Sequence, residues 1–590
     1  MLAGCGGPEV PLSGTIVDAY TGKPVSSATI NIGASQAVTD AGGRYQLASW
    51  RQDASLQIAA AGYEPVTIAL AEQPQLAKPT PPAATLDATL RPNTISGVVT
   101  DAYSRQPLAG ALVKASEVLS ATTGADGRYR LEGVPAGTTI EISADGYAAL
   151  TQPLEQTTTL DAVLRPDVLK GTLLDAATGA PIANATIIAA PNLQSDSVAM
   201  QRIDNSSDGV FTLDGMPEQG VIQVLAPGYR KAVIEIKPGS VPDTIKLEPF
   251  AAKALYVTAA VASNTDLLMK FFDTIDTTEL NAIVIDLKSD LRDDLGLIYY
   301  DSQVPIVKEL KTARPIMDLG AILAEAKKRG IYTIARVHIF SHDNVLADAR
   351  PEWAAQDSKS GGVFADYPGP GIRYAWLDPW NRNVWDYNIQ LSVEAARMGF
   401  DEINYDYIRF PSLEFADDDK DRLKLSKPDA TNDEKYQNIA EMLRQSQAAI
   451  NGAGAFLSVD VFGVAAWQPA SLIGQDIKIM GEHTDYVCPM IYPSHFWNGA
   501  AGFDNPAKHP YEIIAESMRL GLEQMQGKRA KLRPWLQDFT LTWVPDDQIV
   551  EYGPAEVRAQ IKAVEDSGSP GGWLLYDSAN QYTVAALKPQ

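Results

Sequence analysis

Up to Pro249 the chain repeats one pattern three times, which restricts this half to a small fold built in three copies. The segment "SGTIVDAYTGKPVSSATI", beginning at Ser13, returns as "SGVVTDAYSRQPLAGALV" from Ser96 and as "KGTLLDAATGAPIANATI" from Lys170. Every copy then runs through a turn, a Gly-Tyr pair and a closing strand-like segment. With starts at Ser13, Ser96 and Lys170, each copy is long enough to bury its own core, so we expect three consecutive domains.

Within each copy, short segments of alternating apolar and polar residues are separated by Gly, Asp and Pro, which is typical of a small antiparallel β-sandwich. The aromatic residue that follows the central turn, Tyr45, Tyr129 or Phe211, is predicted to lie in the core. These copies show no candidate catalytic residues. We expect them to act mainly as spacers, with glycan or protein binding as the alternative.

After Pro249 short apolar runs alternate with amphipathic segments such as "LGAILAEAKKRG". This alternation is typical of βα units and a parallel sheet. Eight such runs with helical segments between them predict an α/β fold, a (β/α)8 TIM barrel, after the three all-β sandwiches. The eight predicted strands are 254–259, 282–288, 332–340, 402–408, 456–462, 486–492, 533–539 and 572–577.

The net charge of -24 argues against nucleic acid as a partner, because an acidic surface repels phosphates. No apolar run is long enough to span a bilayer. The only cysteines are Cys5 and Cys488, so we expect no disulfide framework, and Cys488 is predicted to be a buried core thiol.

Cys5 lies in "LAGCGG", which resembles a bacterial lipobox. The resemblance implies lipidation of Cys5 and a lipid-anchored protein of the bacterial cell envelope, periplasmic or on the outer surface. The basic and apolar regions of a signal peptide are missing upstream, so we expect a truncated or reassigned start.

In a TIM barrel the functional side chains lie at the C-terminal ends of the strands. Period-two alternation points Asn404 and Asp406 into the barrel and places Ile403, Tyr405 and Tyr407 against the helices. The loops beyond the strands are rich in aromatic residues, as in a cleft that stacks sugar rings. The predicted substrate-binding residues are Asp286, Lys288, Arg336, His338, Asn404, Arg409, Trp376, Trp467, Tyr492, Trp497, Gln537 and Asp577.

Cleavage of a glycosidic bond needs one ionised carboxylate and one protonated acid. Asp406 and Asp460 end neighbouring strands, and such positions allow the roughly 5–5.5 Å separation of a retaining enzyme. A buried ion-pair network with a purely structural role is the alternative.

Five segments resemble an uncharacterised bacterial family of glycoside-hydrolase barrels related to the α-amylase and α-galactosidase groups. They are "NAIVIDLKSDLRDDLGLIYYDS", "WLDPWNRNVWDY", "FDEINYDYIRFPS", "RPWLQDF" and "GGWLLYDSANQYT", and the similarity covers Lys253 to about Val584. The three copies resemble the carboxypeptidase regulatory-like domain, a transthyretin-like sandwich. The implied domains are a lipobox-like segment at 1–11, sandwiches at 12–92, 93–166 and 167–249, and the barrel at 252–590.

The resemblance implies that Asp406, which closes the fourth strand, is the catalytic nucleophile. It gives no equally firm acid/base: Asp460 is the best candidate, although the α-amylase group has a glutamate there, and Asp538 and Asp577 remain alternatives. "DEINYDYI" is also similar to a chitinase motif, but the catalytic glutamate of that motif falls on Ile408.

We therefore expect a glycoside hydrolase that acts on a polysaccharide or oligosaccharide as a monomer, without cofactor or metal. Two alternatives remain open. His338 and His342, four residues apart, could bind zinc with a carboxylate, as in a polysaccharide deacetylase. The barrel could also bind a glycan without cleaving it.

Overall fold

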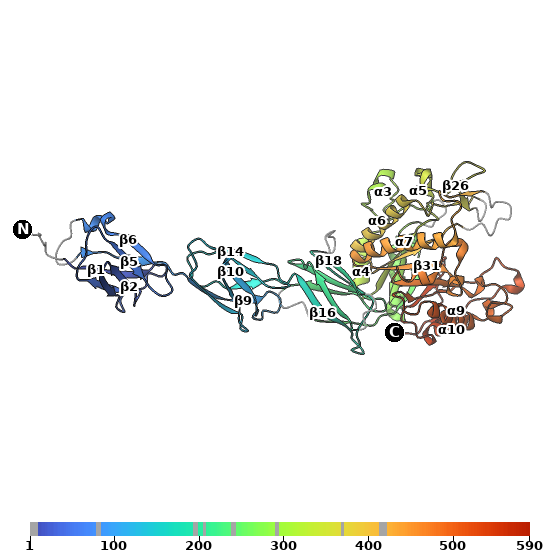
Figure 1. The fold of residues 1–590 in the computed structure, drawn as a ribbon. Helices are drawn as coiled ribbons and strands as arrows, with labels where there is room; N and C mark the ends of the chain where they lie inside the picture. The colour runs from blue at the N-terminus through green and yellow to red at the C-terminus, as the bar shows by residue number, and fades with distance from the viewer. Residues whose placement is uncertain are drawn as a thin grey trace, which may run out of the picture. The chain divides into compact units, whose positions relative to one another are not determined.

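In the computed structural model the described residues are 10–77, 84–192, 199–203, 208–237, 243–289, 294–366, 371–411 and 422–590 (Figure 1). Cys5 and the lipobox-like segment around it lie outside them. The chain divides into two compact units. One consists of Met1–Leu169 with two short segments of the third copy, and the other joins the rest of the third copy to the barrel.

The first copy folds into two four-stranded sheets around one apolar core. Ile16 and Tyr45 enter this core from one sheet, and Ile30 and Ile58 from the other. The first sheet contains β1 (Leu12–Asp18), β4 (Arg44–Leu47), β7 (Ala84–Thr85) and β8 (Ala88–Leu90). The second contains β2 (Thr29–Ile32), β3 (Ser35–Val38), β5 (Ser55–Ala59) and β6 (Val66–Ala69).

The second and third copies each have a three-stranded and a four-stranded sheet in the same arrangement. In the second copy these are β9 (Thr94–Asp101), β12 (Arg128–Glu132) and β15 (Ala162–Leu164), and β10 (Leu112–Ser116), β11 (Leu119–Thr122), β13 (Thr139–Ser143) and β14 (Leu150–Pro153). In the third they are β16 (Val168–Asp175), β19 (Val210–Asp214) and β22 (Thr244–Leu247), and β17 (Ala185–Ala190), β18 (Ala199–Ile203), β20 (Gly220–Leu225) and β21 (Ala232–Ile236).

Two of the repeated residue types have the same structural role in every copy. The aromatic residue after the central turn is buried each time, as predicted. The tyrosine of the Gly-Tyr pair donates its hydroxyl hydrogen bond to the aspartate that ends the first strand of its copy. These pairs are Tyr63–Asp18 (2.9 Å), Tyr147–Asp101 (2.7 Å) and Tyr229–Asp175 (2.9 Å).

After the third copy, eight parallel strands close into a barrel, since β31 pairs with both β29 and β32. All eight predicted strands are present, and the seventh is interrupted at Arg533 and Pro534. In chain order the strands are β23 (Ala252–Val257), β24 (Ala282–Asp286), β25 (Tyr332–His338), β29 (Glu402–Asp406), β31 (Phe456–Phe462), β32 (Tyr486–Ile491), β33 (Lys531–Leu532) with β34 (Trp535–Gln537), and β35 (Gly572–Tyr576).

Helices follow the strands as in a TIM barrel. "LGAILAEAKKRG" forms a helix as predicted, and the helix before the fourth strand ends at Gly399, whose φ of 119° is easy for glycine. The helices between barrel strands are α1 (Ala259–Ala262), α2 (Thr265–Thr277), α3 (Pro305–Leu310), α4 (Leu319–Lys328), α5 (Asn344–Ala349), α6 (Arg382–Met398), α7 (Asn432–Gly452), α8 (Ile477–Met480), α9 (Pro510–Gln524) and α10 (Pro554–Asp566).

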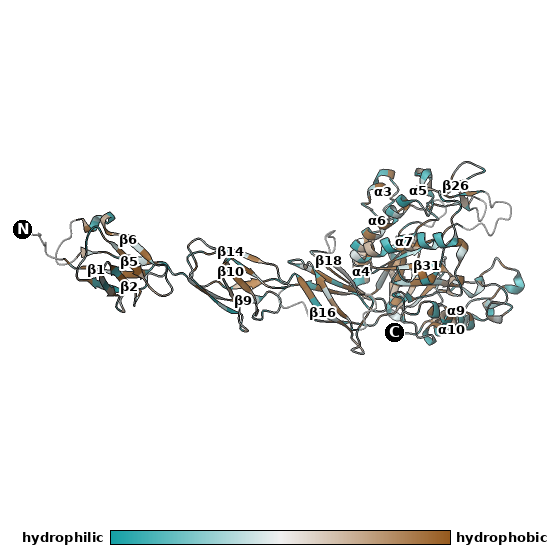
Figure 2. Ribbon diagram, in the orientation of Figure 1, coloured by the Kyte–Doolittle hydropathy of each residue, from teal (hydrophilic) through white to brown (hydrophobic). Residues whose placement is uncertain are grey.

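Two apolar cores result from strands that are buried on both faces. One core lies between strands and helices and includes Ile403 and Tyr405. The other fills the barrel and includes Tyr256, Cys488 and Trp535. Figure 2 shows the apolar colour of β31 and the more hydrophilic colours on the helices. No helix in the described part of the chain is both long enough and apolar enough to cross a membrane.

Candidate active site

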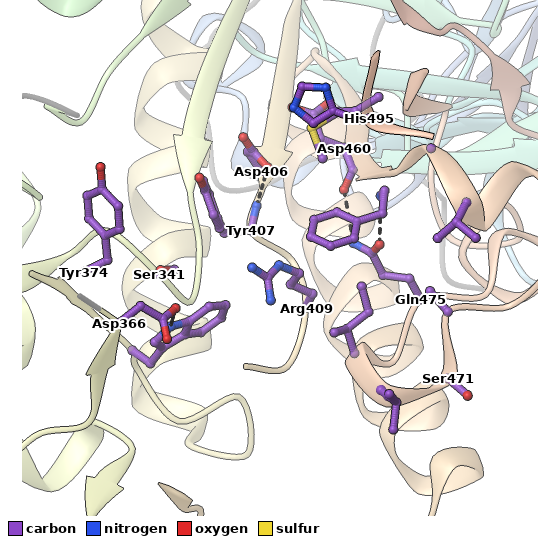
Figure 3. A pocket seen from close by; sticks show the side chains of 18 of the residues that line it. Ser341, Asp366, Tyr374, Asp406, Tyr407, Arg409, Asp460, Ser471, Gln475 and His495 are labelled. Carbon is purple, nitrogen blue, oxygen red and sulfur yellow. Dashed lines mark hydrogen bonds between the residues drawn. The ribbon is translucent and has the colours of Figure 1, made fainter. Parts of the chain in front are cut away.

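A cavity of about 1210 Å³ lies where the barrel strands end and their loops begin. Figure 3 shows Asp406 and Asp460 near one another at one end of this cavity, and Asp366 and Ser471 toward the other. Its remaining walls are mostly aromatic or apolar. The aromatic residues that line it are His342, Phe364, Tyr374, Trp376, Tyr407, Phe462, Tyr492, His495, Phe496 and Trp497.

Asp406, at the end of β29, is held from two sides. Its Oδ2 accepts a hydrogen bond from Arg336 Nη2 (2.5 Å), and its Oδ1 accepts one from the backbone N–H of Tyr407 (2.6 Å). Arg336 also donates to Asp286 (2.7 Å), which in turn accepts from the hydroxyl of Tyr256 (2.5 Å). The nucleophile candidate therefore has a buried counter-charge that a second carboxylate keeps in place.

Asp460, at 2% exposure, is the most enclosed carboxyl in the cavity lining. Its Oδ1 accepts hydrogen bonds from Asn404 Nδ2 (2.8 Å) and Trp535 Nε1 (2.7 Å), whereas its Oδ2 lies 3.9 Å from Arg336 Nε. Burial, and next the charge of Asp406, raise the pKa of Asp460 well above its usual range. The Arg336 contact is too long to outweigh these two effects. Asp460 is thus suited to hold a proton at neutral pH.

Tyr407 lies in the cavity and does not face the helices, so its predicted orientation was wrong. The strand ends at Asp406, and the φ of 52° at Tyr407 breaks the alternation on which the prediction depended. His342 also has a positive φ, 63°, and its ring lies between those of Tyr374 (3.9 Å) and Tyr407 (4.2 Å). These three rings form one wall beside Asp406.

Arg409 lines the cavity as predicted, with its guanidinium 4.6 Å from the ring centre of Trp376 and 4.9 Å from that of Phe462. Asp366 accepts a hydrogen bond from Trp376 Nε1 (2.7 Å). Burial raises the pKa of Asp366. This end of the cavity therefore offers both a cation and a carboxyl next to aromatic rings.

Six of the predicted site residues line the cavity: Asp406, Asp460, Arg409, Trp376, Tyr492 and Trp497. Three others, Arg336, Asp286 and Asn404, lie beneath it and contact its carboxyls directly or through Arg336. The remaining five lie outside the lining. They are Lys288, His338, Trp467, Gln537 and Asp577.

Lys288 corrects our expectation most clearly, because its side chain is enclosed and fully used. It is 1% exposed, and its ammonium donates to His338 O (2.9 Å), Asp343 Oδ2 (2.9 Å) and Asn388 Oδ1 (2.8 Å). An ammonium has three N–H donors, so none remains for a substrate. Lys288 thus supports the loop after β25.

Three of the other four, Gln537, Asp577 and Trp467, also contact neighbouring protein groups. Gln537 is buried and accepts from Ser494, while Asp577 accepts the backbone N–H groups of Ala579 and Gln581. Trp467 lies behind the lining, 5.6 Å from the ring of Phe496 and 5.5 Å from that of Trp497. Asp538, which with Asp577 was an alternative to Asp460 as the acid/base, lies outside the cavity lining and accepts two hydrogen bonds from Thr583.

The rings of His338 and His342 are 5.6 Å apart. Burial, and next the charge of Arg336, lower the pKa of His342 to about 3, and burial lowers that of His338. Both are neutral, as ligands would be. Among the described residues, however, no group of three or more His, Cys, Asp or Glu side chains could hold a metal ion.

Sequence reasoning missed several residues of the site. Trp535 has the same strand parity as Gln537, so alternation could have identified it as inward-facing. Tyr374 and Asp366 come from the long segment between β25 and α6, where no periodicity indicates orientation. These positions depend on loop conformation, which alternation does not describe.

Comparison with known proteins agrees with this architecture. A family model described as "Putative glycosyl hydrolase domain" matches residues 254–582, and the carboxypeptidase regulatory-like domain matches residues 11–91 and 94–165. No curated protein matches the chain.

Several solved structures are similar to the chain. A hypothetical protein from Ruminiclostridium thermocellum ATCC 27405 is 31% identical, with a TM-score of 0.30, covering 35% of this chain and 97% of that chain. The PgaB (BpsB) glycoside hydrolase domain from Bordetella bronchiseptica is 15% identical, with a TM-score of 0.42, covering 57% and 98%. TtGalA, an α-galactosidase from Thermus thermophilus in complex with stachyose, is 12% identical, with a TM-score of 0.34, covering 93% and 95%. Because these TM-scores are low, the assignment rests on the family match.

The closed eight-stranded barrel defines a TIM-barrel protein, and the family match assigns it to the glycoside hydrolase class. The family match covers more than half of the chain, so the chain belongs to this glycosyl hydrolase family, and its barrel follows carboxypeptidase regulatory-like domains. Its substrate class is carbohydrate.

Proposed function

We propose that the barrel hydrolyses a glycosidic bond in a polysaccharide or oligosaccharide by a retaining mechanism, with Asp406 as nucleophile and Asp460 as acid/base. One observation carries the proposal. Two carboxyls at the mouth of the barrel lie near the same guanidinium, that of Arg336, yet their surroundings differ. Asp406 has an ion-pair partner, whereas burial and the Asp406 charge raise the pKa of Asp460. Acid-assisted displacement needs such a pair, in which one carboxyl is ionised and the other holds a proton.

In the first step an oxygen of Asp406 attacks the anomeric carbon while Asp460 gives its proton to the departing glycosidic oxygen. The products of this step are a glycosyl ester on Asp406, a free sugar hydroxyl and an ionised Asp460. In the second step Asp460 takes a proton from water, and the hydroxide oxygen displaces Asp406 from the sugar. Both carboxyls return to their starting protonation states.

The cavity supports a sugar substrate through its shape and lining. Its volume is large enough for more than one sugar ring. The walls present Trp376, Trp497 and Tyr492, whose rings can stack on the C–H faces of pyranoses, and the carboxyls and Arg409 can bind hydroxyl groups. These features support a glycan-binding cavity whether or not the bond is cleaved.

A panel of glycans tests the proposal. The purified protein would be incubated with each glycan, and the anomer formed first would be identified by NMR. A product with the anomeric configuration of the substrate supports the retaining reaction, whereas inversion contradicts Asp406 as nucleophile. Binding without turnover of any panel member would favour the non-catalytic alternative.

For localisation we propose a lipid anchor on Cys5 in the bacterial envelope, supported by the lipobox-like "LAGCGG". Protein made in its own host should then partition into a detergent phase, and Cys5→Ser should release it. Mass spectrometry that finds no lipid on Cys5 would contradict this proposal.

A further inference from the structure

The carboxyl of Asp460 is bound asymmetrically. Its Oδ1 receives two N–H groups, from Asn404 on β29 and from Trp535 on β34. An indole nitrogen can only donate, and so can an amide nitrogen. A proton on Oδ1 would therefore be directed at two other protons. In the described part of the chain, Oδ2 has no hydrogen-bond donor, and its nearest cation is Arg336 Nε at 3.9 Å.

We propose that Trp535 and Asn404 are positioning residues that direct the acidic proton of Asp460 to Oδ2, the oxygen left free to meet the glycosidic bond. This inference rests on the proposed role of Asp460 as acid/base. The two donors fix the plane of the carboxyl, because they approach one oxygen from two strands. They also stabilise the anion that remains after the proton is transferred, which makes Asp460 a better acid.

Trp535 is well placed for this role because packing leaves it little freedom. It is 2% exposed, and its ring makes edge contacts with Tyr256 (6.4 Å) and Tyr576 (6.0 Å) inside the barrel. Asn404 is also fully buried, and its amide nitrogen donates to Ser458 (3.0 Å) as well as to Asp460. The donors are therefore preorganised before substrate binds.

Trp535→Phe tests the proposal, since it removes the N–H and keeps an aromatic ring. The donors lower the pKa of Asp460 against the larger effects of burial and the Asp406 charge. We therefore expect the carboxyl of Asp460 to titrate at higher pH in Trp535→Phe. ¹³C NMR of the aspartate carboxyls would measure this titration. On an active substrate, the alkaline limb of kcat/KM should move in the same direction.

Trp573→Phe is the matched control. Trp573 is also a buried barrel tryptophan (1% exposed), but it lies in the core between strands and helices, and its indole nitrogen has no hydrogen-bond partner among the described residues. This substitution should leave the Asp460 titration in place.

We also expect Trp535→Phe to lower turnover of natural glycans by about 10- to 100-fold, while substrates with a good leaving group lose less.

The NMR readout separates this proposal from the proposed function. An unmoved titration in Trp535→Phe would overturn the positioning role, whatever the glycan panel shows. A moved titration in a protein that cleaves no glycan would support the positioning and contradict the hydrolase. Equal losses of turnover on natural and activated substrates would also overturn the positioning role, because they indicate a general distortion of the site.

Discussion

Strand β29 carries two buried carboxylates, Glu402 and Asp406, and each is paired with an arginine from another strand. At the N-terminal end, Arg533 Nη1 donates to both oxygens of Glu402 (2.8 Å each), and Tyr332 adds its hydroxyl (2.8 Å). Both charged side chains are fully buried. At the C-terminal end, Asp406 pairs with Arg336 and lines a cavity.

The two ends differ in their balance of charge. Among the residues that the structure describes, Arg533 forms an ion pair with one carboxylate, whereas Arg336 lies near three carboxyls, those of Asp286, Asp406 and Asp460. Three ionised carboxyls around one guanidinium would be strongly destabilising, and the raised pKa of Asp460 relieves this. An excess of buried carboxyls beside a cavity therefore indicates a catalytic role, whereas a balanced and fully buried ion pair indicates a structural role.

The largest expected effect is at the mouth. Asp406→Asn keeps the shape of the side chain and removes its charge, so turnover should fall by about 10⁴-fold, or ~5 kcal/mol. Arg336 keeps Asp286 as a partner, so the loss of stability should be small. Kinetics on a confirmed substrate and thermal denaturation would measure both.

A chemical rescue sharpens this prediction. In Asp406→Ala, external azide should partly restore turnover and give a glycosyl azide of inverted anomeric configuration. Near-native turnover of Asp406→Asn would mean that the carboxylate is structural and would contradict Asp406 as nucleophile.

At the N-terminal end we expect the opposite outcome. Glu402→Gln leaves Arg533 buried without its counter-charge, which typically costs about 3–5 kcal/mol of folding stability. Specific activity of the folded fraction should stay close to that of the unmodified protein. Urea denaturation and active-site titration would test the two halves of this prediction.

The double variant Glu402→Gln, Arg533→Met is the control, because it removes both charges. It should recover much of the lost stability. If Glu402→Gln instead lowered turnover while stability held, the distinction between the two ends of the strand would be wrong.

A further difference concerns the contacts that the third copy makes with the barrel. Its Ile188 and Leu225 belong to the core that fills the barrel, and Arg529 donates to Asn184 O (2.8 Å) and Thr186 Oγ1 (2.9 Å). The predicted boundaries end the third sandwich at 249 and place the barrel at 252–590, so a chain starting near Pro249 would contain the barrel without these contacts. Exposing these side chains should now cost about 3 kcal/mol.

Two truncations compare these boundaries. A chain that starts at Asp167 should keep the urea midpoint that the barrel has in the full-length chain. A chain that starts at Pro249 should unfold at a lower urea concentration. Equal midpoints would restore the original boundary and show that the third copy contributes nothing to barrel stability.

Much of this architecture follows from the sequence for a simple reason. Repeats and period-two alternation report which face of a strand is buried, and this identified the barrel strands and the inward positions of Asp406 and Asp460. Alternation does not report whether an inward polar group meets a cavity or a partner. Lys288 was therefore misplaced, because Asp343 and Asn388, which bind it, lie outside the barrel strands.

The smallest expected effect concerns stability at the mouth. In the folded chain, burial and then the Asp406 charge raise the pKa of Asp460 above its unfolded value. Between those two pKa values the folded state binds more protons than the unfolded state, so this site lowers the free energy of unfolding as pH rises. Asp460→Asn has the shape of the protonated acid and does not titrate, so it escapes this loss. We expect the variant to be inactive on natural glycans yet more stable than the unmodified protein at neutral pH. The two should converge below the unfolded pKa of about 3.9. Urea midpoints measured across this pH range would test the difference, in which all other titrating groups cancel. A constant offset at every pH would show that Asp460 gains no proton on folding, and the mouth would then resemble the balanced pair at Glu402.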